Sequence, residues 1–150
     1  MNKKGYEWAP LFLRLIIGYG FMAHGLAKLS RGTAGFEKLL AQTGVPFPHS
    51  ASRIVPYVEL LGGFAILTGS FVSLVAIPLV VTMLVAMFTV QIKYGFSSVN
   101  TIGLTSEGPL FGPPGYEINL LYIAGLISLI LSGGGVFSVD ALIGRKKRKK

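Results

Sequence analysis

The chain has 150 residues, of which 51% are hydrophobic and 13% are charged, and its net charge is +8. Ordinary soluble domains carry about 25% charged residues, so this composition and a mean hydropathy of +0.63 exclude a typical soluble protein and indicate a membrane protein. The absence of cysteine excludes disulfides and thiolate metal sites, and with only two histidines and no metal or flavin motif, no haem, flavin or metal is expected.

Four apolar segments are long enough, or nearly so, to cross a bilayer, which takes roughly 20 residues. They cover residues 8–29, 51–70, 71–92 and 116–137. The first is too long for a cleaved signal peptide and carries Arg14, which favours a first span. The sequence therefore predicts an all-α membrane protein: one integral membrane domain over residues 1–150, folded as a four-transmembrane-helix bundle.

Basic residues flank the predicted spans at both ends of the chain. Lys3 and Lys4 precede the first span, and six basic residues fill positions 145–150 of a tail that begins at residue 144. The positive-inside rule then predicts that both the N-terminus and the C-terminus are cytoplasmic. Because the basic run directly follows a span, attraction to anionic lipid head groups explains it better than nucleic-acid binding, and no nucleic-acid partner is expected.

The two long connections then lie outside. In the first, residues 30–50, Phe36, Leu39 and Leu40 fall at i, i+3 and i+4, which predicts a short amphipathic helix on the membrane surface over residues 35–42. The second, residues 93–115, is rich in glycine, serine and proline and shows no obvious secondary structure. Whether it is a lid, a partner-binding segment or a simple linker stays open.

Charged and amide side chains inside or at the ends of these spans are the candidate site. A charged group near the bilayer centre costs about 2.5–3.5 kcal/mol on insertion scales, so such groups normally mark a functional site. His24 and Lys28 are four residues apart and share a helix face, and Arg14 lies within about 80° of it. We expect a polar cavity in the outer half of the bundle. Its predicted residues are Arg14, His24, Lys28, Glu59, Gln91, Glu117 and Asn119.

Each of these side chains also has a structural interpretation. Lys28 and Glu117 lie near span ends and could extend their charged groups to the interface. His24 and the two amide side chains could form hydrogen bonds between helices. Arg14 and Glu59 are deeper in the predicted spans, and their alternative is a purely structural ion pair.

The chemistry of such a cavity leaves two ligand classes open. A cationic wall of Arg14, His24 and Lys28 could hold a small oxyanion, or a carbonyl oxygen that gains negative charge on reduction. Glu59 could take or give a proton. A quinone pocket needs an apolar slot, donors for the carbonyl oxygens and a proton route, whereas an anion site needs only the cations. The residues alone do not separate the two.

Several short motifs occur in a fixed order along the chain. They are Arg14-Leu-Ile-Ile-Gly18, His24-Gly25-Leu-Ala-Lys28-Leu29, Glu59-Leu-Leu-Gly62-Gly63, Tyr116-Glu117-Ile-Asn119-Leu and Phe137-Ser-Val-Asp140. On these motifs the sequence resembles the DoxX family of small four-helix membrane proteins. The resemblance implies a multi-pass protein of the prokaryotic cytoplasmic membrane linked to redox chemistry. Relatives include the membrane subunit of thiosulfate:quinone oxidoreductase.

Two hypotheses follow. In the first, the chain is the quinone-interacting subunit of an oxidoreductase with a partner redox subunit. Arg14 and His24 would bind the quinone or oxyanion oxygens, Glu59 would carry protons in catalysis with His24, and Lys28 and Glu117 would guard the entrance. In the second, the chain is a non-enzymatic membrane scaffold or a small-solute or anion carrier. Whether it is itself an enzyme stays open, and its glycine-rich helix faces allow a homodimer without requiring one.

Overall fold

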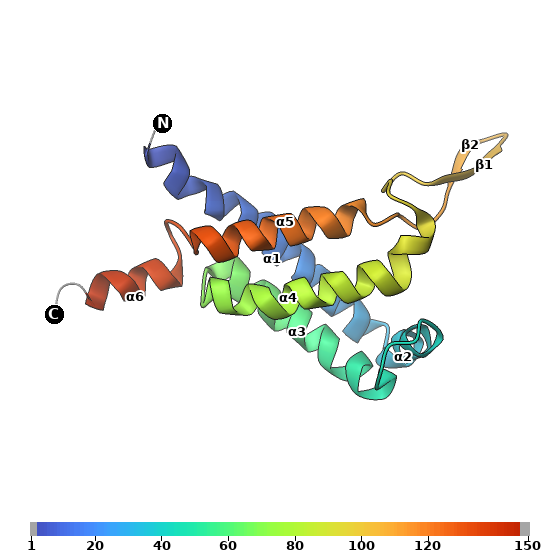
Figure 1. Cartoon of the computed structure of the whole chain (residues 1–150), viewed down its shortest axis with the longest axis horizontal. Helices are drawn as coiled ribbons and strands as arrows, with labels where there is room; N and C mark the ends of the chain where they lie inside the picture. The colour runs from blue at the N-terminus through green and yellow to red at the C-terminus, as the bar shows by residue number, and fades with distance from the viewer. Residues whose placement is uncertain (1–2, 148–150) are drawn as a thin grey trace.

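Four helices form the body of the computed structural model, which describes residues 3–147, with side chains described for residues 7–144 (Figure 1). They are α1 (Lys3–Ser30), α3 (Pro48–Thr68), α4 (Val72–Ala86) and α5 (Glu117–Ser132). Helix α4 continues into a π-helical turn, η1 (Met87–Gln91), and a 3₁₀ turn, η2 (Ile92–Tyr94). The remaining elements are α2 (Thr33–Gln42), the hairpin β1 (Thr101–Thr105) and β2 (Gly108–Phe111), and α6 (Val139–Lys147). Residues 148–150 of the predicted basic tail lie outside the described residues.

Three helical segments are long and apolar enough to span a membrane: Glu7–Ser30, Pro48–Thr68 and Val72–Tyr94. The predicted helical membrane protein is therefore confirmed. The fourth apolar helix, α5, has 16 residues and is about 24 Å long, shorter than a hydrocarbon core of about 30 Å. It ends at Ser132 rather than near residue 137, because Gly133 and Gly135 adopt positive φ angles of 71° and 65° and turn the chain out of the helix.

The helices associate as two close pairs, α1 with α3 and α4 with α5, which cross around an apolar core (Figure 1). Fully buried Phe21, Ile66, Leu79, Leu126 and Leu129 form the centre of this core. The start of α1 and helix α6 lie at one end of the bundle, called here the terminal end. Helix α2 and the β-hairpin lie at the other, the loop end. Which side of the membrane each end faces stays a prediction.

The connections at the loop end are more structured than the sequence pattern indicates. The amphipathic helix predicted over residues 35–42 is present as α2, with Leu40 buried against α3. The second connection contains an antiparallel hairpin, with Thr105 opposite Gly108 next to its turn. Its strands are largely exposed, so no buried face gives them the alternating hydrophobic pattern by which strands are recognised.

Glycine allows α1 and α3 to pack backbone against backbone. A Cβ atom placed on Gly63 would lie 2.7 Å from the carbonyl oxygen of Gly18 and the amide nitrogen of Met22. One placed on Gly25 would lie 2.6 Å from the carbonyl oxygen of Pro56. Real Cβ atoms do not approach backbone so closely, so this crossing requires glycine at these positions. It thereby fixes where the side chains of α1 meet those of α3.

Gly63→Ala is expected to lower the thermal stability of the purified protein, because the added methyl group must push α1 away from α3. Overpacking of this kind typically costs about 1–3 kcal/mol. Gly35→Ala in α2 is the matched control: nothing lies within 4 Å of its added Cβ, and alanine should favour the helix by about 0.5–1 kcal/mol. Thermal unfolding in detergent compares the two. Equal melting temperatures would show that the crossing adapts to a side chain.

Candidate functional site

A buried ion pair between α1 and α3 is the centre of the site. Lys28, in the last turn of α1, places its Nζ 2.5 Å from both carboxylate oxygens of Glu59 in α3. The Glu59 side chain is 1% exposed, whereas that of Lys28 is 28% exposed. Lys28 therefore connects a fully buried carboxylate to a more open space. A charge this deep in an apolar protein is stabilised only because its partner is in contact with it.

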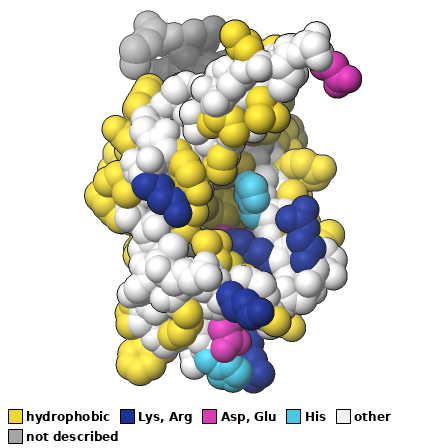
Figure 2. Space-filling view, turned by 90° about the vertical axis from the view of Figure 1, so that its right-hand side faces the viewer, with side chains coloured by type: hydrophobic (Ala, Val, Ile, Leu, Met, Phe, Trp, Pro, Cys, Tyr) yellow, Lys and Arg dark blue, Asp and Glu magenta, His cyan; other side chains and the backbone are white. Residues whose placement is uncertain are grey.

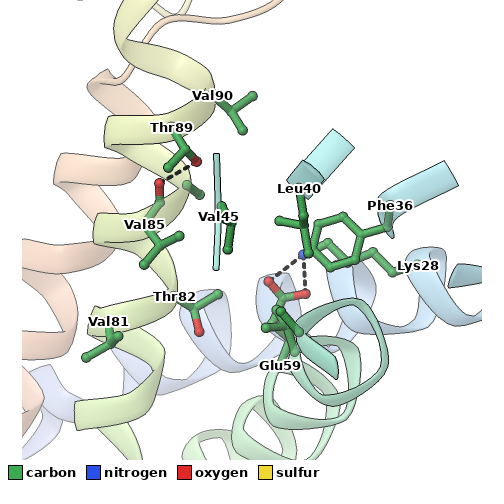
Figure 3. Close-up of a pocket in the computed structure, with 13 residues that line it drawn as sticks. Lys28, Phe36, Leu40, Val45, Glu59, Val81, Thr82, Val85, Thr89 and Val90 are labelled. Atoms are coloured by element: carbon green, nitrogen blue, oxygen red, sulfur yellow. Dashed lines mark hydrogen bonds and ion pairs between the residues drawn. The ribbon is translucent and has the colours of Figure 1, made fainter. Parts of the chain in front are cut away.

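That space is a cavity of about 230 Å³ between α3 and α4 (Figure 3). Figure 2 looks onto the loop end and shows a hollow with mainly hydrophobic walls. The cavity is lined by Lys28, Phe36, Leu40, Val45, Ala51, Val55, Glu59, Val81, Thr82, Val85, Ala86, Thr89 and Val90. The Thr82 and Thr89 hydroxyls donate to backbone carbonyls of their own helix, at 3.0 and 2.7 Å. The site is thus an apolar slot with one ion pair at its edge, and is called below the Lys28–Glu59 pocket.

Helix α2 forms the side of the pocket nearest the loop end, as Figure 3 shows for Phe36 and Leu40. The Nζ of Lys28 lies 4.8 Å from the centre of the Phe36 ring, a cation–π contact. A carboxylate oxygen of Glu37 in α2 lies 3.1 Å from Nδ1 of His49 at the start of α3, and this contact links α2 to α3. Lys28 therefore contacts both the covering helix and the buried carboxylate.

The opposite wall includes the π-helical turn η1. Thr89 and Val90 belong to this turn and line the pocket. A π-helical turn inserts an extra residue into the helix and shifts the direction of the side chains after it. Such turns are frequent at functional sites. Here residues of this turn form part of the pocket wall.

The structure separates Arg14 from this pocket. Arg14 is 2% exposed and lies at the terminal end, where its Nη1 donates to the carbonyl oxygens of Gly134 and Val136 at 2.5 and 3.4 Å. Its Nη2 donates to those of Leu67 and Phe137 at 3.3 and 3.2 Å. The ion pair with Glu59 considered from the sequence does not form. Arg14 instead joins the end of α3 to the segment that follows α5.

The other predicted site residues are also distributed. His24 is exposed beside Tyr122, with 6.5 Å between the ring centres, and does not line the pocket. Glu117 accepts hydrogen bonds from the backbone nitrogen and the hydroxyl of Ser98, at 2.9 and 2.6 Å. It therefore fastens the second connection to the start of α5.

The two amide side chains lie along α4, η1 and α5. Asn119 is 3% exposed, and its Nδ2 lies 3.5 Å from the carbonyl oxygen of Met83, linking α5 to α4. Gln91 is half-buried at the end of η1, and its Oε1 has no hydrogen-bond partner among the residues that the structure describes. Of the seven predicted residues, the structure thus brings only Lys28 and Glu59 together in the pocket.

Sequence reasoning missed most of the pocket wall. Phe36 and Leu40 could have been recognised, because they lie on the apolar face of a predicted amphipathic helix. Such a face must pack against another apolar surface, and here that surface is near Lys28 at the end of the first span. The valines and threonines of α4 could not have been recognised in this way, because this helix is apolar on every side. Within residues 3–147, no group of three or more histidine, aspartate or glutamate side chains is placed to hold a metal ion.

Comparisons with known proteins agree with this architecture. The sequence model of the DoxX family matches residues 9–92, a region that contains every residue that lines the Lys28–Glu59 pocket. A Bacillus subtilis (strain 168) protein named "Putative oxidoreductase CatD" is 26% identical over 148 residues, covering 99% of this chain and 96% of that protein. No solved structure matches the chain. With its apolar helices and a family match over more than half of its length, the chain is a multi-pass membrane protein that belongs to the DoxX family.

Proposed function

We propose that this protein is a redox-associated subunit of the prokaryotic cytoplasmic membrane, and that it binds a quinone in the Lys28–Glu59 pocket. Membership of the DoxX family and the likeness to a protein named as an oxidoreductase support a redox role. The observation that carries the proposal is the ion pair at the edge of an otherwise apolar slot. Such a slot excludes water while presenting one strong donor and one proton-carrying group.

The pocket suits a single neutral ring. Its volume of about 230 Å³ lies below the roughly 300–1,000 Å³ of sites for drug-sized ligands, so a quinone ring would enter while its chain remains outside. Lys28 has three N–H donors, and its two contacts with Glu59 leave one for a carbonyl oxygen of the ring. The valine side chains of α4 would pack against the face of the ring.

Glu59 and Lys28 would supply the protons of the reaction. Reduction of a quinone to a hydroquinone takes two electrons and two protons, and each carbonyl oxygen becomes a hydroxyl. The electrons would come from a two-electron donor on a partner redox subunit. In the ion pair the proton is on Lys28, so Lys28 can protonate the ring oxygen that it holds, and the Glu59 carboxylate in contact with it can take up the next proton and pass it on. The pair thus combines the positioning of the ring with a proton route.

The geometry is less favourable to an anion carrier, the alternative left open by the sequence. The cationic wall of Arg14, His24 and Lys28 does not form, since Arg14 lies at the other end of the bundle. The charge of Lys28 is balanced by a carboxylate 2.5 Å away, which would repel an entering anion. A neutral ligand meets neither difficulty.

Glu59→Gln is expected to reduce the amount of quinone that remains bound to protein purified in mild detergent. Glutamine has the shape of glutamate and can accept a hydrogen bond from Lys28, so folding should be retained, whereas the second carboxylate oxygen that holds the Lys28 ammonium at the pocket edge is lost. Mass spectrometry of organic extracts measures quinone per protein. We expect the variant to lose about one equivalent of the quinone that the wild type retains.

Glu107→Gln, an exposed change in the hairpin turn, is the matched control and should retain the wild-type amount. A wild-type protein that carries no quinone and does not bind added decyl-benzoquinone would contradict the proposed function. In that case a scaffold role would be the better account of the fold.

A further inference from the structure

Among the residues whose side chains the structure describes, His24 and Tyr122 are two polar side chains without a hydrogen-bond partner. Their rings lie edge to face, 6.5 Å apart, where α1 meets α5. The Tyr122 hydroxyl lies directly over Gly20, which has no side chain to obstruct it. The structure gives neither side chain a hydrogen bond from residues 7–144, the part of the chain whose side chains it describes. The imidazole and the phenol hydroxyl can therefore each donate a hydrogen bond to a bound acceptor.

The helix rise places both residues within a hydrocarbon layer about 30 Å thick. His24 is six residues before the end of α1, about 9 Å below that end, and Tyr122 is five residues into α5, about 7.5 Å below its start. The α1 span, Glu7–Ser30, is about 36 Å long, so His24 lies about 6 Å inside a 30 Å hydrocarbon core. Donors without partners at this depth are costly, because lipid chains cannot accept hydrogen bonds. A bound acceptor would remove that cost.

An apolar groove lies between α1 and α5, with Tyr122 in its wall. It has a volume of about 220 Å³ and is lined by Leu13, Ile16, Ile17, Ile118, Leu121, Tyr122 and Gly125. The hydroxyl of Tyr122 is the one polar side-chain group among these residues. Leu13 is eleven residues before His24, so groove and polar pair together extend for about 16 Å along α1. This length suits a long hydrocarbon chain with a polar head at one end.

We infer that His24, Tyr122 and this groove form a second, membrane-facing binding site for a neutral carbonyl-bearing ring with a long apolar chain. The imidazole N–H and the phenol O–H donate to the carbonyl oxygen, and the chain occupies the groove. The depth selects the ligand: ester carbonyls of diacyl lipids lie at the interface, whereas a quinone ring enters the hydrocarbon. Lys28 is one helical turn from His24 on the same face of α1, so the site adjoins the Lys28–Glu59 pocket. The inference rests on the proposed function for its ligand class, but different residues carry it.

Tyr122→Phe tests the site, because it removes one hydroxyl and keeps the ring that packs on Phe21. Full-length protein in lipid nanodiscs is titrated with decyl-benzoquinone, and binding and the infrared carbonyl stretch of the bound probe are measured. We expect the affinity of one class of bound probe to fall about two- to tenfold, the loss typical of one hydrogen bond. The shifted carbonyl band of that class should disappear. His24→Leu should act on the same class. Tyr57→Phe, an exposed tyrosine of α3, is the matched control and should change neither.

The remaining outcomes separate this site from the proposed function. If Glu59→Gln lowers binding while Tyr122→Phe and His24→Leu bind like the wild type, the pocket stands and the second site is wrong. If the wild type binds no quinone at all, both proposals fail. If the wild type retains a diacyl phospholipid that the Tyr122→Phe protein loses, with no effect on quinone, the groove is a lipid site and the inferred ligand class is wrong.

Discussion

Arg14→Met should be among the most destabilising single substitutions in this protein, with a loss on the order of 3–5 kcal/mol, because several buried carbonyl oxygens lose their charged donor at once. Methionine fills a similar volume but donates no hydrogen bond. The carbonyl oxygens of Leu67, Gly134, Val136 and Phe137 would then lose their donor inside the bundle. A lost hydrogen bond to a charged group costs about 1.5–3 kcal/mol by itself. The yield of monodisperse protein and its thermal unfolding in detergent measure the effect.

Arg53→Met provides the matched comparison, since Arg53 is an exposed arginine of α3 and its replacement should change stability little. Asp140 links the same network to α4, because its carboxylate accepts from the backbone nitrogens of Phe71 and Val72 at 2.8 and 3.0 Å. If the Arg14→Met protein proved as stable as the Arg53→Met protein yet lost bound quinone, a structural role would be contradicted. The ligand-binding role predicted from the sequence would then be favoured.

Arg14 and Lys28 show how much of the site the sequence could reveal. Hydropathy alone marks both as costly residues that need partners, and this part of the prediction depends only on position within a span. The partner depends on where two helices cross, which the spacing of residues along one helix does not determine. The crossing of α1 and α3 is set by backbone contacts at Gly18, Gly25 and Gly63. It places Lys28, and not Arg14, beside Glu59.

The fold was predictable to a similar depth. Long apolar segments and an amphipathic pattern identify α1, α3, α4 and α2, because these signals arise from burial in lipid or against one neighbour. The length of α5 was not predictable from hydropathy, since Val136 and Phe137 are apolar but follow three glycines that end the helix. The hairpin was not recognisable either, because both faces of its strands are exposed.

Lys28→Met is expected to lose about 3–5 kcal/mol of stability, because it leaves the Glu59 carboxylate buried without a counter-ion. The double variant Lys28→Met with Glu59→Leu should regain stability near or above the wild-type level, since an apolar pair removes the cost of burying two charges. Thermal unfolding of the wild type, both single variants and the double variant gives the coupling energy between the two positions. Quinone binding is measured on the same four proteins.

Stability and binding should separate in this cycle. If the pair serves a ligand, the double variant folds well and loses the quinone held in the Lys28–Glu59 pocket, because the apolar slot remains but the donor and the proton carrier are gone. If the pair serves only the fold, the double variant binds as much quinone as the wild type, and this result would contradict the pocket. A double variant that is more stable than the wild type and has lost quinone would show that the ion pair is kept for ligand binding at a cost in stability.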